Sequence, residues 1–561
     1  MTKIVKSIFF GFVLCVLCAA RAQTVNAKSC NTSDVQTAIN TATEGQTVTI
    51  PAGSCTWTTG VTISGKGITV TGAGSNRIVA YDTGTLSLQS SGSLSVPISG
   101  FSPGFSGSTF TNGLAVKVFQ EGNDPAYMLG TVSSYAGSTL TVSVSSDSGS
   151  VSCNVTPCPR WLVATNQPCS SMTCITNSSG TNPLFAITED TTDHTNVGNI
   201  QFLAGTISQN IFIISYASGG QAVLLHDMWM SGNSSNGGPP SGNACMIMDN
   251  SPWRGVFWNL SFDSYPFNVS TLGAVSVQDK SNASGNVSWT TGSKWGNADT
   301  TGQSNAYAET NDYHAMGFAT STDDQGRANF RYSLYDNSGI GTHGADTSQY
   351  GQRYIDVNNN TFVFEGYNNG NTYNMQAWVF MRGGTLAFWG NTIANIQSTD
   401  YGTRPTVQMT DYNLQEDTAQ NQCWGAGFSS GGQYYHTPRQ VGFGYVTGSG
   451  TASYTGHTPN PIYTVSGSTD SVTYVGDSEP IYMWGNNQVP VTNVGVEDYG
   501  GSACTNPDSS SKYIVANRDY FNGSTAKPGY TAAPYPNPLD LSSTGSSNTP
   551  AAPTNLQATH N

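Results

Sequence analysis

The sequence predicts an all-β protein: a right-handed parallel β-helix with a short N-terminal capping helix and a β-rich insertion. Short β-branched and aromatic segments recur along the chain, and such short strands need similar neighbours on which to stack. Most are separated by the length of one coil plus a variable loop, and asparagines after them suit the left-handed backbone of coil corners. The wider gap after Val256 leaves room for further coils. These segments begin at Ile200, Val223, Val256, Phe330, Tyr354 and Leu386.

A single amphipathic helix is expected at 33–42. Ser33 and Gln36 have the spacing of a capping box, and apolar residues follow at helical intervals from Val35 to Ala42. A helix at this position would cover the open end of the first coil, whose strand edges would otherwise be unpaired.

Composition divides the rest of the chain. Alternating segments and four cysteines mark an insertion, long polar loops follow the main coils, and a Ser-Gly-Thr-Pro tail ends the chain. The expected units are a signal peptide at 1–22, the cap helix and first coils at 23–78, the β-rich insertion at 79–185, the main β-helix with the candidate site at 186–400, irregular coils at 401–540 and a flexible tail at 541–561.

The first 22 residues have the features of an export signal. Lys3 and Lys6 precede an apolar run at 8–17, and Ala20-Arg21-Ala22 has the small-x-small form of a signal-peptidase site. The run is too short to cross a bilayer, and no later segment is apolar enough to do so. We therefore expect a secreted, periplasmic or cell-surface protein without membrane insertion.

The charge balance excludes nucleic acid as the expected partner. The formal net charge is −14, and loss of Lys3, Lys6 and Arg21 with the signal would lower it to −17. Nucleic-acid binding needs a basic surface that releases counterions. We expect a monomer.

Eleven cysteines are present, of which Cys15 and Cys18 belong to the signal. In an oxidising compartment disulfides are the expected state, and local spacing suggests Cys30–Cys55, Cys153–Cys158 and Cys169–Cys174. Three cysteines remain, so one thiol has no partner within the chain. They are Cys245, Cys423 and Cys504.

Ionisable residues concentrate at 295–362. Eight of the 34 acidic residues lie there, together with three arginines and two histidines, among aromatic residues and glycines. This mixture is typical of a surface that binds a polar ligand, and it makes the stretch the candidate site.

Several motifs along the mature chain resemble those of secreted bacterial β-helix proteins of the pectate-lyase-like superfamily. They include D-V-Q-T-A-I-N-T-A at 34–42, I-P-A-G-S-C-T-W at 50–57, W-G-N-A-D at 295–299, A-Y-A-E-T-N at 306–311, F-R-Y at 330–332, H-G-A-D at 343–346, N-N-T-F at 359–362, R-G-G at 382–384 and E-P-I-Y-M-W-G-N at 479–486. The resemblance implies carbohydrate-active chemistry, by elimination or hydrolysis, or glycan binding alone.

Elimination across a uronic acid needs a base for the C5 proton and a positive charge beside the carboxylate. By resemblance to superfamily lyases, the predicted base is Arg331 or Arg353, with His343 as proton donor. A Ca²⁺ ion is expected because it would bridge this acidic protein and an acidic polysaccharide. Its predicted ligands are Glu309, Asp323, Asp324 and Asp346.

Further residues are expected to contact the polysaccharide. Arginines beside acids on a β-helix are also typical of structural ion pairs, and aromatic residues are also typical of internal stacks. The candidates are Tyr307, Tyr313, Arg327, Tyr350 and Arg382, with Trp378 and Trp389 as further stacking residues.

Two other functions stay open. Asp323-Asp324 and the later G-T-H-G resemble the paired aspartates and G-H-G of polygalacturonase-like hydrolases, although the upstream N-T-D and downstream R-I-K are absent. The tail at 550–559 is similar to the first strand of a fibronectin type III domain. Together with the insertion, it is compatible with a non-catalytic adhesin.

Overall fold

The computed structural model describes most of the mature chain with gaps. The described residues are 23–82, 86–121, 123–151, 160–177, 183–203, 210–233, 245–251, 254–265, 273–278, 299–314, 316, 318–323, 326–342, 354–364, 378–381, 383–395, 406–409, 428–430, 433–435, 443–446, 476–487, 494–496, 514 and 516–540. The expected signal peptide and tail lie outside them. Among the described helices, none has the length and apolar character needed to cross a membrane.

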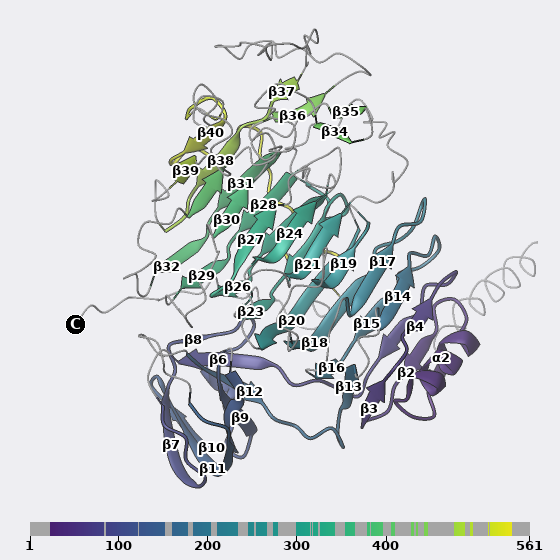
Figure 1. The fold of residues 1–561 in the computed structure, drawn as a ribbon, viewed down its shortest axis with the longest axis vertical. Coiled ribbons are helices and arrows are strands. Elements are labelled where there is room, and N and C mark those ends of the chain that lie inside the picture. The colour runs from purple at the N-terminus through teal and green to yellow at the C-terminus, as the bar shows by residue number, and fades with distance from the viewer. Residues whose placement is uncertain are drawn as a thin grey trace, which may run out of the picture.

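The predicted parallel β-helix is confirmed. Strands stack in parallel register from coil to coil, for example Glu309 beside Arg331 and Arg331 beside Asn358. Each complete coil has three strands, which form three faces running along the molecule (Figure 1).

The first face contains β1 (Thr24–Asn26), β2 (Thr47–Thr49), β5 (Thr69–Thr71), β15 (Asn196–Gly198), β18 (Leu224–Asn233), β20 (Val256–Tyr265), β22 (Ala306–Glu309), β25 (Arg327–Arg331), β28 (Tyr354–Asn358), β31 (Thr385–Trp389), β38 (Ile481–Trp484) and β40 (Tyr520–Asn522).

The second face contains the later halves of β18 and β20, together with β3 (Gly53–Trp57), β13 (Thr173–Asn177), β16 (Ile200–Leu203), β23 (Asp312–His314), β26 (Leu334–Asp336), β29 (Thr361–Phe364) and β32 (Thr392–Asn395). The third face is a separate sheet of β4 (Val61–Ile63), β14 (Phe185–Thr188), β17 (Phe212–Ser215), β19 (Cys245–Asp249), β21 (Gly273–Gln278), β24 (Phe318–Asp323), β27 (Gly339–Thr342), β30 (Val379–Met381), β33 (Val407–Met409) and β39 (Val494–Val496).

The corner between the first and second faces has the left-handed backbone that the sequence predicted. The same position in successive coils has positive φ, at Asn199, Asp227, Asn259, Thr310, Tyr332, Asn359, Gly390 and Gly485. Asparagine and glycine adopt this conformation at low cost, which explains their frequency here. The gap after Val256 does contain a further coil, formed by β22, β23 and β24.

A ladder of buried asparagines follows this corner. The Asn360 amide donates to the Phe330 carbonyl at 2.8 Å and accepts from the Ser333 N–H at 2.9 Å, both in the preceding coil. Asn311, Asn391 and Asn486 bond in the same way to the coils before them. Each side chain thus satisfies two backbone groups that a tight corner leaves unpaired.

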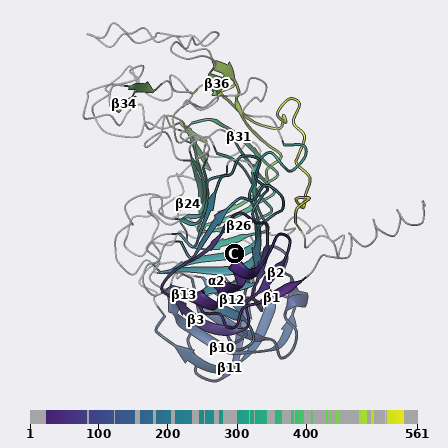
Figure 2. The same cartoon turned by 90° about the vertical axis from the view of Figure 1, so that its right-hand side faces the viewer.

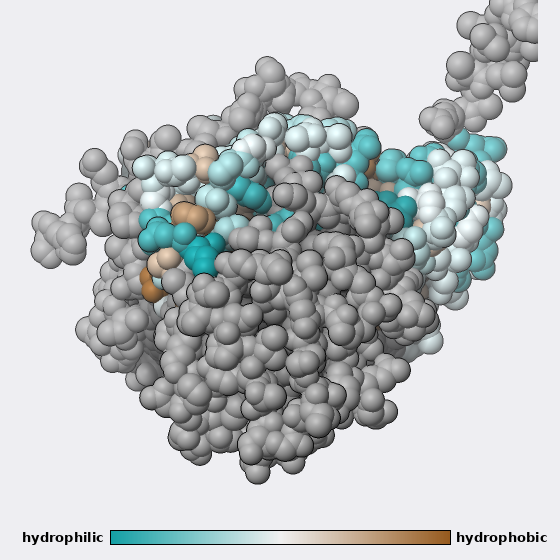
Figure 3. Space-filling model, turned by 90° about the horizontal axis from the view of Figure 1, so that it is seen from above, coloured by the Kyte–Doolittle hydropathy of each residue, from teal (hydrophilic) through white to brown (hydrophobic). Residues whose placement is uncertain are grey.

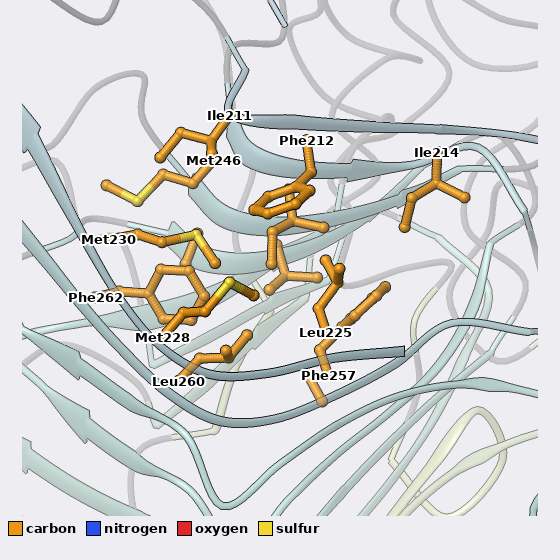
Figure 4. Packing of buried hydrophobic residues seen from close by; sticks show 14 of the residues in the cluster. Ile211, Phe212, Ile214, Leu225, Met228, Met230, Met246, Phe257, Leu260 and Phe262 are labelled. Carbon is orange, nitrogen blue, oxygen red and sulfur yellow. The ribbon is translucent and has the colours of Figure 1, made fainter. Parts of the chain in front are cut away.

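Apolar side chains from all three faces fill the interior. Met228, Met230 and Leu260 meet Phe212 from the third face (Figure 4). Beside them runs an internal aromatic stack, in which Tyr313 lies 5.2 Å from Phe262 and 4.8 Å from Tyr335, measured between ring centroids. Burial and stacking of large side chains stabilise the coils against one another.

The predicted capping helix is present as α2 (Thr32–Thr41), which buries Val35, Ala38 and Ile39 against the first coil. The predicted capping box at Ser33 does not form. The helix starts one residue earlier with Asn31 as N-cap, so Ser33 lies inside the first turn, and Asp34 accepts a bond from Ser29 at 2.5 Å.

Two of the predicted disulfides are confirmed in the described residues, Cys30–Cys55 and Cys169–Cys174. The first joins the start of α2 to β3. The predicted Cys153–Cys158 pair, Cys423 and Cys504 lie outside the described residues, whereas Cys245 begins β19.

The insertion is an antiparallel sheet that leaves the β-helix between β5 and β13. Its strands are β6 (Ile78–Asp82), β7 (Gly92–Pro97), β8 (Gly100–Phe101), β9 (Ala115–Gln120), β10 (Asn123–Ala136), β11 (Thr139–Ser148) and β12 (Trp161–Thr165), with a 3-10 turn at Gly107–Thr109. It is shorter than the expected 79–185, because β13 and β14 already pair with strands of the β-helix. Two small hairpins occur later, β34 (Phe428–Ser430) with β35 (Gln433–Tyr435) and β36 (Phe443–Val446) with β37 (Gly476–Ser478).

The insertion packs on the second face (Figure 1, lower left) through apolar residues and a buried charge cluster. Arg77 contacts Asp312 at 3.2 Å, and Arg160 contacts Asp336 at 3.1 Å. His314 lies between the two aspartates, 3.2 Å from each. Burial opposes its charge, but hydrogen bonds and attraction from both carboxylates raise the pKa of His314 to about 10.

Candidate functional site

The outer surface of the first face is partly covered by the last described segment of the chain. Residues 529–540, here called the C-terminal strap, run back along the face from the late coils toward the earlier ones (Figure 2). Ala533 packs with Val256, Trp258 and Tyr307. The strap therefore separates an exposed region near β31, β38 and β40 from another near the start of β20.

Beneath the strap lies a buried ion pair. Arg331 donates from Nε to Glu309 Oε2 at 2.7 Å, and its terminal nitrogens donate to the Ala533 and Pro534 carbonyls at 3.2 and 2.6 Å. Its guanidinium also stands 4.7 Å from the Tyr307 ring. Only 1% of Arg331 is exposed, so the residue is held by the strap and shielded from solvent.

Glu309 has no free carboxylate oxygen. Oε2 accepts from Arg331, and Oε1 accepts from the Asn537 N–H at 2.8 Å. Burial raises the pKa of Glu309, although the Arg331 charge and these hydrogen bonds act in the opposite direction. This arrangement suits a structural ion pair and does not fit a Ca²⁺ ligand.

A second carboxyl group, Asp356, connects the strap to the exposed region. It accepts from the Tyr530 hydroxyl at 2.6 Å, Trp389 Nε1 at 3.1 Å and Asn358 at 2.9 Å. Burial raises the pKa of Asp356, although these hydrogen bonds act to lower it. Asp356 thus fixes the orientation of the Trp389 indole and the Tyr530 ring.

Next to Asp356 is an aromatic ladder, which we define as Trp389, Trp484, Tyr482, Phe521 and Tyr530. Strand pairing places Trp389 beside Trp484 and Tyr482 beside Phe521 on adjacent coils. The indoles stack at 5.8 Å with an interplanar angle of 11°, and the second pair stacks at 4.9 Å and 13°. Tyr530 meets both indoles edge-on, and all five side chains are half-buried.

The part of the described surface that is seen from above is mostly polar (Figure 3). Seen from above, its residues are mainly hydrophilic or intermediate in hydropathy, with few hydrophobic ones (Figure 3). Half-buried aromatic side chains that gather on one face, as in the ladder, are a feature of the kind that marks interaction sites.

The structure brings some of the predicted site residues together. Tyr307, Glu309, Arg327 and Arg331 all lie on the first face, on two successive coils. Tyr307 is buried and donates to Asp299 at 2.6 Å, with its pKa raised by burial and by that carboxylate. Arg327 is buried 5.8 Å from the Tyr354 ring, and burial lowers its pKa.

Other predicted residues are placed apart. Tyr313 belongs to the internal stack, and Trp378 packs partly buried against the core. Internal packing was the alternative to sugar contact that the sequence left open for aromatic residues. Asp323 ends β24 on the third face. Glu309, by contrast, ends β22 on the first face, where it pairs with Arg331.

Several candidates lie outside the described residues: Asp324, His343, Asp346, Tyr350, Arg353 and Arg382. Conversely, Trp484, Tyr482 and Phe521 were not among the predicted site residues. The sequence pattern that could have identified two of them is Tyr482-Met483-Trp484 in β38, because alternate residues of a strand lie on the same side.

Comparison with known proteins adds little. No family model and no curated protein sequence matches the chain. Among solved structures, the Gp54 tailspike of Acinetobacter baumannii bacteriophage AP22, in complex with A. baumannii capsular saccharide, is 7% identical over 93% of this chain and 75% of that chain, with a TM-score of 0.19. The tailspike protein gp49 from Pseudomonas phage LKA1 is 10% identical over 67% and 71%, also with a TM-score of 0.19.

At this level of similarity neither structure informs the site. The β-helix follows from the strand pairing itself, and membership of the pectate-lyase-like superfamily stays a prediction.

Proposed function

We propose that the protein binds a polysaccharide along the first face, with the aromatic ladder as its principal contact. The observation that carries this proposal is the half-exposed stack of Trp389 and Trp484 beside polar groups fixed by Asp356. A sugar ring has apolar C–H faces and hydroxyl groups at its edge. It therefore suits a surface that combines aromatic carbon with hydrogen-bonding groups.

The proposal includes that the protein is secreted into a compartment where it meets polysaccharide. The two described disulfides support it, because such bonds persist in oxidising environments. The acidic net charge further suggests that an acidic polysaccharide would need bound cations to approach.

Cleavage by β-elimination is the proposed reaction on this face. Of the two predicted bases, Arg353 is the better candidate, because Arg331 is engaged by Glu309 and by two strap carbonyls. His343 remains the proposed proton donor. Any Ca²⁺ would be held by Asp323, Asp324 and Asp346, since both Glu309 oxygens already accept hydrogen bonds.

Binding is tested by native-gel retardation on gels that contain pectins, alginates or glycosaminoglycans. We expect Trp389→Ala and Trp484→Ala each to weaken binding roughly threefold to tenfold, since one aromatic contact contributes about 0.5–1.5 kcal/mol. Tyr127→Ala, a half-buried aromatic on the insertion, is the matched control and should change nothing. Retardation that is equal in all variants would contradict binding at the ladder.

Elimination is tested separately by ultraviolet absorbance of unsaturated uronates, with and without Ca²⁺. A rise that disappears in Arg353→Ala supports the lyase. New reducing ends without absorbance indicate a hydrolase, and binding without either product indicates a non-catalytic glycan-binding protein.

A further inference from the structure

A pocket of about 170 Å³ opens on the first face at the far end of the strap from the ladder. Its wall comes from the residues that immediately precede the first-face strands of four coils. These include His194 before β15, Gln221 before β18, Arg254 before β20 and Asn305 before β22. The side chain of Leu539, at the end of the strap, closes one side.

Two polar side chains in this wall, the buried Asn305 and the half-buried Arg254, have buried hydrogen-bonding atoms that no described atom satisfies. Asn305 is 1% exposed, and neither its amide oxygen nor its amide nitrogen has a partner. The Nε–H of Arg254 is likewise buried without an acceptor. Each buried unsatisfied group costs about 1–3 kcal/mol, so proteins rarely retain several in one place without a use.

Arg254 is nevertheless firmly positioned. Its terminal nitrogens donate to the Gly220 and Ala217 carbonyls, and Glu189 lies 3.6 Å away. These contacts fix the guanidinium, and its Nε–H is the donor that has no acceptor among the described atoms. The site is therefore oriented before any ligand arrives.

His194 adds an acceptor. Its Nδ1 lies 2.9 Å from the Ala222 carbonyl, which can only accept, so Nδ1 carries the proton and Nε2 is the acceptor of the neutral ring. Val256 and Leu539 contribute apolar surface. The pocket thus combines donors, acceptors and an apolar wall within a small volume.

We propose that this pocket binds one sugar unit, with ring hydroxyl groups bonded to Asn305 and Arg254 and the apolar face of the ring against Val256 and Leu539. Hydroxyl groups both donate and accept, as the unsatisfied Asn305 amide requires. The volume lies below the roughly 300 Å³ at which pockets for larger ligands begin, so it suits a single ring rather than an oligosaccharide. This inference rests on the proposed polysaccharide binding and assigns the first face a second contact point.

The experiment uses the full chain and saturation-transfer NMR with methyl glycosides of a neutral hexose and of a hexuronic acid. We expect saturable binding of at least one probe in the millimolar range. Asn305→Ala and the pocket-filling Leu539→Trp should each weaken it about tenfold or more. Preference for the uronate would identify a carboxylate at Arg254, and equal binding would identify recognition by hydroxyl groups; both results support the proposal.

Two controls keep the outcomes distinct. Asn305→Ala should not lower the unfolding temperature, because the amide it removes has no partner in the described structure; a large loss of stability would show a structural role and overturn the inference. Tyr127→Ala, on the insertion, should leave monosaccharide binding unchanged. If the ladder binds polysaccharide but neither monosaccharide binds, the pocket proposal is overturned and the ladder proposal stands. If a monosaccharide binds but no polysaccharide does, the ladder proposal is overturned and the pocket proposal stands.

Discussion

At the residue scale, the most consequential side chains are those that satisfy backbone groups inside the coils. The asparagine ladder does this at a corner where the chain turns too tightly to pair its own N–H and C=O groups. Its members are buried and each bonds to the preceding coil, so one asparagine connects two coils as well as stabilising one turn.

Asn360→Ala should therefore lower the free energy of unfolding by about 2–4 kcal/mol. It leaves the Phe330 carbonyl and the Ser333 N–H without this partner, and a buried unsatisfied group costs about 1–3 kcal/mol. Urea unfolding followed by circular dichroism measures the change. The neighbouring Asn359→Gly is the control, since glycine tolerates the positive φ of 53° at that position. Equal effects of the two substitutions would contradict the role assigned to the ladder.

At the element scale, α2 and the strap are held to the β-helix by a few specific contacts. The Cys30–Cys55 bond fixes the start of α2 to β3, and the Trp57 indole donates to the Cys30 carbonyl at 2.8 Å. The strap is held by hydrogen bonds to Glu309, Arg331 and Asp356.

Replacement of Cys30 and Cys55 by alanine should lower stability by about 3 kcal/mol, because the bond closes a loop with a sequence separation of 25 residues. The expected effect is a lower thermal midpoint and earlier amide exchange in α2. The Cys169–Cys174 double substitution is the matched comparison. Its separation is only 5 residues, so the loss should be smaller. A larger loss from the second pair would be inconsistent with this account.

Deletion of residues 529–561 should destabilise the β-helix by roughly 3 kcal/mol or more, because several hydrogen bonds to charged groups are lost, each contributing about 1.5–3 kcal/mol. The unfolding midpoint in urea reports the change. Deletion of 543–561 alone retains the strap and is the control. If both deletions gave the same midpoint, the strap contacts would not stabilise the first face.

At the scale of the whole molecule, the insertion and the β-helix meet at a buried cluster of charges. His314 faces Asp312 and Asp336, with Arg77, Arg160 and Glu121 around them. Glu121, His314 and Asp336 have a spacing that could hold a metal ion, but Arg160 already supplies the positive charge beside Asp336. The cluster is best explained as the polar part of the contact between the two units.

This cluster predicts a pH dependence of stability. Because the folded-state pKa of His314 is about 10, above its ordinary value of 6.5, its contribution is fully present below pH 6.5 and is lost as the pH rises through 10. Thermal midpoints should therefore fall between pH 7 and 10. His314→Gln should be less stable at pH 7 and show a shallower fall, whereas His194→Gln, outside the cluster, should retain the wild-type slope. Identical slopes in all three proteins would contradict a charged His314.

Much of the fold could be predicted because it depends on local patterns. β-branched strands, corner asparagines and the spacing of Cys30 and Cys55 are visible within short windows of sequence. The end of the insertion was less predictable, because Thr173–Asn177 has the same short-strand character whether its partner is parallel or antiparallel. Strand partners are a property of the whole topology.

The site could be predicted only in part. Glu309 and Arg331 were both expected in the 295–362 site, but their pairing and their enclosure by the strap were not, since Arg331 and Ala533 are 202 residues apart in the sequence. Trp389 was among the expected stacking residues, whereas Trp484 and Phe521 come from coils that the sequence leaves irregular. No local pattern shows that Trp389 stacks on Trp484, or that Phe521 stacks on Tyr482.

The measurement that tests the central claim most directly is amide hydrogen exchange of the full chain with and without a polysaccharide that retards it in gels. We expect new protection concentrated in β31, β38 and β40 and in the strap near Tyr530, with little change in the insertion. Protection confined to the insertion or the third face, or none at a saturating polysaccharide concentration, would contradict binding at the aromatic ladder.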